Sequence, residues 1–152
     1  MKVGVISDTH GLLRPEALAA LSGVQHILHA GDVGDLAILN ALREIAPVTA
    51  IRGNIDTSGP CAELPPTDFV ELGGKLLYLV HSVKDLDINP VVAGVAVVVS
   101  GHSHRPSIEG RDGVLYLNPG SAGPRRFDLP VSIAEVDITG EIDARIVHLT
   151  AG

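Results

Sequence analysis

The amino-acid sequence predicts an α/β protein with two packed β-sheets and helices on their outer sides. Three observations favour this fold. Short β-branched runs alternate with helical patterns through the first two thirds of the chain. The last third carries alternating segments separated by turn residues, which indicates a strand-rich C-terminal part. The 152 residues, 45% of them hydrophobic, are enough for one compact domain over residues 1–152.

Five short runs rich in Val, Ile and Leu are predicted to form buried strands, because glycine or polar residues bound each of them. These runs are Lys2 to Ser7, His26 to Ala30, Val48 to Arg52, Lys75 to Val80 and Val95 to Ser100.

Two segments between these runs have apolar residues at helical spacing, Arg14 to Leu21 and Leu36 to Ile45. Pro15 suits a first helical turn, because its missing N–H has no partner there in any case. Asp35 is placed to cap the second helix with its carboxylate.

The rest of the chain is divided by turn residues. A loop is predicted over Pro60 to Pro66, and a Gly73-Gly74 turn follows the short strand Phe69 to Glu71. Further strands are predicted where alternating segments lie on either side of turn signals: Val114 to Leu117 after the turn Gly110 to Gly113, and Val131 to Ile138 and Glu141 to Leu149 around Thr139-Gly140.

The composition limits which classes of partner the protein can bind and in which cellular compartment we expect it. A formal charge of −7 disfavours a dedicated nucleic-acid module, and with 3% aromatic residues few side chains could stack on bases. The lone Cys61 cannot form an internal disulfide, which favours a reducing compartment. No signal peptide fits before Asp8, and the apolar run Val91 to Val99 is about half of the ~20 residues that cross a bilayer. We therefore expect a cytoplasmic protein without a membrane segment.

Each of the five predicted strands ends just before a candidate metal ligand. In open α/β sheets, ligands bind in the crevice beyond the carboxyl ends of the strands, so these side chains are expected to converge. The set is Asp8, His10, Asp32, Asn54, His81, His102 and His104.

The chemistry of this set suits two adjacent divalent ions, because it combines carboxylate, imidazole and amide groups and leaves Cys61 outside. Two ions roughly 3.5–4 Å apart can lower the pKa of a shared water and hold a phosphoryl oxygen, as phosphoester hydrolysis requires. Gly31, Gly53 and Gly101 directly precede ligands, where small residues let the backbone approach closely.

Taken singly, the same residues have simpler interpretations. Asp8 and Asp32 could be cap or turn residues. His26, His29 and His148 are expected to be ordinary strand side chains, although His29 lies close enough to Asp32 in sequence to support it. The pair Arg125-Arg126 could bind a substrate phosphate or could be solvated.

The ordered blocks resemble the calcineurin-like metallophosphoesterase superfamily, and in particular its small single-domain bacterial and archaeal phosphodiesterases. The blocks are Asp8-x-His10, Gly31-Asp32, Gly53-Asn54-x-Asp56, His81, Gly101-His102-x-His104 and Asn118-Pro119-Gly120-Ser121. The resemblance implies a four-layer α/β/β/α sandwich with two mixed sheets.

The resemblance also implies roles for the residues. One ion would take Asp8, His10, Asp32 and His104, and the other Asp32, Asn54, His81 and His102, with a bridging hydroxide as the attacking group. Asp32, Asn54 and His81 are then the expected catalytic residues. Asn54 and Arg125 are the expected substrate-binding residues. The ions are expected to be Mn²⁺, with Fe, Co, Ni or Zn as alternatives.

The chain departs from the family pattern at two positions. Ile55 stands where many members carry a histidine after the Gly-Asn pair, and Val83 where the small branch often has a second histidine. Neither side chain can protonate a leaving group. We therefore expect a preference for substrates with good leaving groups.

The leading interpretation is a metal-dependent phosphodiesterase that acts on small phosphodiesters. The alternative is a non-catalytic interaction scaffold, resembling the retromer subunit built on this fold. A mononuclear metal-binding regulator is a third. The oligomeric state stays open, since Val91 and Val92 could either form a homodimer interface or belong to the core.

Overall fold

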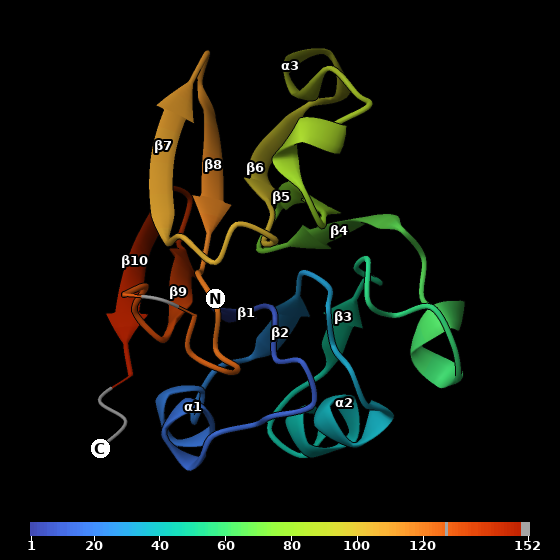
Figure 1. The fold of residues 1–152 in the computed structure, drawn as a ribbon. Coiled ribbons are helices and arrows are strands. Elements are labelled where there is room, and N and C mark those ends of the chain that lie inside the picture. Colours follow the sequence, from blue (N-terminus) through green and yellow to red (C-terminus); the bar gives the residue numbers. More distant parts are fainter. Residues whose placement is uncertain (127, 150–152) are drawn as a thin grey trace.

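The computed structural model describes residues 1–126 and 128–149, and it shows two five-stranded sheets packed face to face (Figure 1). The strand order is β10-β9-β1-β2-β3 in the first sheet and β4-β5-β6-β8-β7 in the second. The predicted α/β sandwich is confirmed.

The strands of the first sheet are β1 (Lys2–Ile6), β2 (His26–His29), β3 (Val48–Ala50), β9 (Ser132–Ile138) and β10 (Ile142–His148). Those of the second sheet are β4 (Thr67–Leu72), β5 (Lys75–Val80), β6 (Val95–Val99), β7 (Ser107–Arg111) and β8 (Val114–Asn118). The helical elements are α1 (Pro15–Ala20), α2 (Leu36–Arg43) and α3 (Pro90–Ala93), with 3₁₀ turns η1 (Pro60–Glu63) and η2 (Val83–Asp85).

Parallel pairing at the centre of each sheet sets the position of the site. Strand β1 runs parallel to β2, and β2 to β3; in the second sheet β5, β6 and β8 are parallel. The carboxyl ends of these strands therefore lie at one edge of their sheet. The predicted convergence of the strand ends depends on this arrangement.

Three apolar clusters hold the layers together. The cluster between the sheets includes Val5 and Leu28 of the first and Leu79 and Val97 of the second, all buried. On the outer side of the first sheet, α1 and α2 pack over β1, β2 and β3 (Figure 1). Pro15 starts α1, and the Asp35 carboxylate accepts from the Ala37 N–H, as the sequence predicts.

The helical layer on the second sheet is thin. It consists of η2, the four-residue α3 and the segment between them, whose Leu86 and Ile88 pack on β5 and β6. Strands β7 and β8 form a hairpin at the edge of this sheet opposite to β4 (Figure 1). The fourth layer is therefore present but does not extend over the whole sheet.

Several elements differ from the sequence-based expectation. The run Val91 to Val99 divides into α3 and β6, and Val92 on α3 is 83% exposed, so a core role for it is wrong. Strand β7 was not predicted, because all five of its residues are exposed and give no apolar alternation. The predicted loop Pro60 to Pro66 contains η1, and β3 ends at Ala50 rather than Arg52. No helix in the described part of the chain is long and apolar enough to pass through a membrane.

Candidate metal centre

Six of the seven predicted ligands converge in two neighbouring groups. The ligand atoms of Asp8, His10 and His104 lie within 4.8 Å of one another, and so do those of Asp32, His81 and His102. Each group combines side chains from loops after strands of the first sheet with side chains from loops after strands of the second sheet. The seventh, Asn54, is exposed and lines a cavity together with His81 and His102.

Asp32 lies between the two groups. Its Oδ2 is 3.2 Å from His81 Nε2 in its own group and 3.4 Å from His10 Nε2 in the other. Its Oδ1 accepts from the Ile55 N–H at 3.1 Å, which turns Oδ2 toward the two histidines. A carboxylate in this position can contact ions in both groups.

Asp8 is held in a single orientation. Its Oδ2 accepts from the Ser7 hydroxyl at 2.7 Å and from the His102 N–H at 3.1 Å. This leaves Oδ1 facing His104 Nε2 at 3.4 Å and His10 Nε2 at 3.8 Å. The sequence did not predict this contact of Ser7, because a serine at a strand end carries no distinctive signal.

The tautomer of His81 follows from its hydrogen bond. Nδ1 lies 2.7 Å from the Ala30 carbonyl oxygen, which can only accept, so Nδ1 carries the proton and donates. Nε2 then presents its lone pair toward the centre, as a metal-ligating histidine requires.

Burial and neighbouring groups act in opposite directions on the pKa values of Asp32 and His81. Burial opposes ionisation of Asp32, but the imidazole of His81, whose Nε2 lies 3.2 Å from Oδ2, and the hydrogen bond from the Ile55 N–H outweigh burial and lower the Asp32 pKa to about 2. Burial also opposes protonation of His81, while its contacts with Asp32 and the Ala30 carbonyl raise its pKa. The centre therefore keeps a carboxylate ionised at a buried position.

Four buried polar atoms of this centre have no hydrogen-bond partner among the described residues: Asp8 Oδ1, His10 Nε2, His81 Nε2 and His104 Nδ1. Buried polar atoms are almost always paired, because an unpaired one loses its hydration without replacement. Three of these atoms surround the same space, since Asp8 Oδ1 is 3.8 Å from His10 Nε2 and 3.9 Å from His81 Nε2. An unpaired carboxylate oxygen facing unpaired imidazole nitrogens is a donor set for divalent cations, so the residues fit such ions.

Two glycines allow the loops to close on this centre. A Cβ on Gly53 would overlap the Asp32 carboxylate, and one on Gly101 would come within 2.6 Å of Asp8 Oδ2. The expectation that small residues permit close approach here is confirmed.

Supporting residues lie around the centre. Asp56 accepts from the backbone N–H groups of Val33, Gly34 and Gly53, which ties the loop after β2 to the loop after β3. Asn118 donates to the Gly101 carbonyl at 3.0 Å and accepts from the Gly120 N–H. Both residues belong to the sequence blocks that carried the family resemblance.

The remaining candidates lie elsewhere. His29 is fully buried and contacts Thr9 behind the centre, whereas His26 is half-buried and His148 exposed. Arg125 is exposed and lines neither of the two cavities beside the centre, so its role in substrate binding stays a prediction.

Comparison with known proteins identifies the family. A model of the calcineurin-like phosphoesterase superfamily domain matches residues 1–141. The chain belongs to this superfamily.

Relatives within the calcineurin-like phosphoesterase superfamily cover nearly the whole chain. A probable metallophosphoesterase of Methanocaldococcus jannaschii is 35% identical over 158 residues, which cover 98% of this chain and 82% of the relative. The solved structure of YfcE, a phosphoesterase from E. coli, has a TM-score of 0.71 and 30% identity, covering 90% of this chain and 88% of that chain. A Vps29 variant from Entamoeba histolytica has a TM-score of 0.76 at 22% identity over 97% and 99% of the two chains, which shows a shared fold.

Proposed function

We propose that this protein is a phosphodiesterase that hydrolyses small phosphodiesters with the help of two divalent metal ions. The observation that carries the proposal is the position of Asp32 Oδ2, within 3.4 Å of His10 Nε2 on one side and 3.2 Å of His81 Nε2 on the other. The relatives are named metallophosphoesterase and phosphodiesterase, which supports the same chemistry.

The ligand sets are proposed as follows. Asp8, His10, Asp32 and His104 would hold one ion, and Asp32, Asn54, His81 and His102 the other. When bound, such a pair supplies an activated water and stabilises negative charge on the phosphoryl oxygens. Mn²⁺ is the proposed ion, and mixed oxygen and nitrogen ligands also accept Fe, Co, Ni or Zn.

The residues of the chain have distinct roles in this proposal. Ser7 and the His102 N–H fix the Asp8 carboxylate, and the Ala30 carbonyl fixes the ring of His81. The Asn54 amide lines the cavity beside them and can donate to a phosphoryl oxygen. Catalytic roles are proposed for Asp32, Asn54 and His81.

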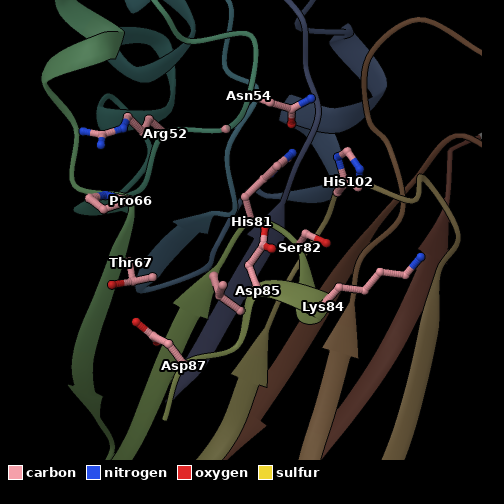
Figure 2. A pocket seen from close by; sticks show the side chains of 12 residues that line it. Arg52, Asn54, Pro66, Thr67, His81, Ser82, Lys84, Asp85, Asp87 and His102 are labelled. Atoms are coloured by element: carbon pink, nitrogen blue, oxygen red, sulfur yellow. The ribbon is translucent and has the colours of Figure 1, made fainter.

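The first cavity accommodates a substrate of small-molecule size. It has a volume of about 670 Å³, within the usual range for ligand sites. Figure 2 shows Asn54, His81 and His102 at one end of it and Thr67 and Asp87 at the other. With the charge of −7 on the whole chain, this favours small phosphodiesters over long nucleic acids. The cytoplasm is the proposed compartment, since the only cysteine is a buried free thiol.

Hydrolysis of bis(p-nitrophenyl) phosphate with and without Mn²⁺, together with elemental analysis, tests the proposal. We expect Mn²⁺-dependent release of p-nitrophenolate and two bound ions per chain. Two bound ions without hydrolysis would support the scaffold, and a single bound ion would support the mononuclear regulator.

The two departures from the family pattern lead to a prediction on leaving groups. Ile55 is 43% exposed and Val83 42% exposed, and neither can protonate a leaving oxygen. We expect kcat/KM for aryl diesters to exceed that for matched alkyl diesters by at least about 10²-fold, the lower range of what general acid catalysis contributes. Ile55→His should narrow this difference. Comparable kcat/KM values for both substrates, with chemistry rate-limiting, would contradict the prediction.

A further inference from the structure

A second cavity adjoins the metal centre on the side of the β7–β8 hairpin. Its volume is about 350 Å³, and it is bounded by the segment 82–84, the loop 100–103 and the hairpin. It shares Ser82, Lys84 and His102 with the first cavity. A diester bound at His102 could therefore extend one arm into each cavity.

The thin fourth layer explains why this space exists. Register pairs Glu109 with Tyr116 and Ser107 with Asn118, so these side chains share one face of the hairpin. On the same sheet, Leu86 and Ile88 cover β5 and β6. The hairpin instead presents polar side chains to the cavity.

The charges in the second cavity favour an anion. Among the residues that the structure describes, its lining carries the cations Lys84 and Arg111 and one carboxylate, Glu109. The Arg111 guanidinium lies 5.0 Å from the centre of the Tyr116 ring and donates a hydrogen bond to Glu109 at 2.8 Å. Lys84 has no ion-pair partner among residues 1–126 and 128–149. In Figure 2 it extends away from Asp87, the acidic end of the first cavity.

Ser103 adds a neutral donor. Its hydroxyl oxygen accepts from Asn118 Nδ2 at 3.1 Å and from the Arg105 N–H at 3.2 Å. Because these bonds use its oxygen as acceptor, the hydroxyl proton is available to a ligand.

The first cavity has no excess of cationic side chains, because two carboxylates match its Arg52 and the shared Lys84. Asp85 and Asp87 line it, and the Arg52 guanidinium there donates to the Leu64 carbonyl at 3.0 Å. Carboxylates accept from hydroxyl and amine groups and repel anions. The two cavities therefore differ in the substrate arm that each suits.

We infer that the second cavity binds a second anionic group, a phosphate or a carboxylate, on one arm of the substrate, with Lys84 and Arg111 as the residues that recognise it. This inference rests on the proposed phosphodiesterase function. It makes the substrate an asymmetric diester, with an uncharged polar arm in the first cavity and an anionic arm in the second.

A binding measurement tests the inference better than a hydrolysis rate does. A diester can bind with either arm as the leaving group, so its rate of hydrolysis does not report which cavity holds the anionic arm. The probes are dibenzyl phosphinate, which has no hydrolysable bond, and its derivatives with one para-carboxylate or para-phosphonate. With Mn²⁺-loaded protein in calorimetry, we expect at least one probe with the added anionic group to bind about tenfold more tightly than unsubstituted dibenzyl phosphinate, because the phosphinate charge is common to all three probes. The better of the two identifies the preferred anion.

Matched variants locate the effect. Lys84→Gln and Arg111→Gln should each remove most of the preference, whereas Glu109→Gln should increase it by freeing Arg111. Arg145→Gln is the control, because Arg145 pairs with Glu135 on the first sheet. Equal affinity for all three probes, or a preference unchanged in both cation variants, would overturn the inference alone. Failure of unsubstituted dibenzyl phosphinate to bind would contradict the proposed function, and the inference with it.

Discussion

Five residues of the metal centre adopt left-handed backbone conformations. The φ angles are 56° at Asp8, 48° at His10, 55° at Asp32, 69° at His102 and 61° at His104. Such a conformation costs a non-glycine residue roughly 1–2 kcal/mol. Hydrogen bonds between loops hold it, such as the His10 N–H to the Asp32 carbonyl at 2.9 Å. The remainder of the fold thus stabilises a strained backbone at the centre, which is common at functional sites.

His29 supports the centre in one protonation state. Its Nδ1 accepts from the Gly31 N–H, so Nε2 carries the proton and donates to Thr9, whose hydroxyl donates to the Val33 carbonyl. A second proton on Nδ1 would face the Gly31 N–H. Burial lowers the His29 pKa to about 4.

This pKa predicts loss of stability in acid. Between pH 6.5 and about 4 the unfolded chain binds a proton at His29 that the folded protein does not, so the free energy of unfolding falls as pH falls. His29→Asn keeps an acceptor for Gly31 but does not titrate in this range. Denaturant unfolding of both metal-free proteins should show that the wild type loses about 3 kcal/mol more than the variant over this window. The same pH dependence in both would contradict the prediction.

At the scale of residues, the sequence predicted the proposed ligands but did not predict the hydrogen bonds and backbone conformations that hold them. All seven proposed ligands follow predicted strands, which periodicity reveals. The role of Ser7 and the left-handed backbone were not predictable, because they depend on segments distant in sequence. The contact between the His102 N–H and Asp8, for example, joins residues 94 positions apart.

At the scale of elements, the loops after the strands pack directly on one another. Asp56 ties Val33 and Gly34 to Gly53, and the Gly53 backbone lies against the Asp32 carboxylate. The position of Asp32 therefore depends on the path of the loop after β3.

Gly53→Ala tests this packing. A Cβ there meets the Asp32 side chain and backbone, so Asp32 must shift, and we expect diesterase activity to fall about 10²-fold or more. Gly110→Ala is the matched control, because a Cβ at Gly110 meets nothing within 4 Å. Full activity of Gly53→Ala, with wild-type metal content, would show that the loop can move without cost.

Two elements, α3 and β7, were not predicted from the sequence, and the reason differs between them. Asn89, Pro90 and Gly94 are start and stop signals of α3, but only four residues lie inside the helix, so apolar periodicity could not show it. Strand β7 is an exposed edge strand, and its pairing with β8 is what reveals it.

At the scale of the molecule, the centre joins the two sheets. Asp8, His10 and Asp32 follow strands of the first sheet, whereas His81, His102 and His104 follow strands of the second. Ions bound to both groups would hold the sheets together at this edge. Ligand binding to the folded state alone raises the free energy of unfolding.

Metal should therefore raise the melting temperature. One ion at about 100 times its Kd adds about 2.7 kcal/mol, and each kcal/mol raises Tm by roughly 2–4 °C in a chain of this size. We expect a rise of at least about 5 °C with Mn²⁺ and its reversal by EDTA, measured by calorimetry. Asp143→Asn, which removes an exposed carboxylate on β10, should retain the rise. A Tm independent of Mn²⁺ would contradict a centre that links the sheets.

The central claim is that one carboxylate joins two metal positions, and the metal content of Asp32→Ala tests it most directly. Elemental analysis after equilibration with Mn²⁺ should find two ions per chain in the wild type and fewer than one in Asp32→Ala. His10→Ala, which affects one group, should retain about one ion. Two bound ions and full diesterase activity in Asp32→Ala would contradict the account.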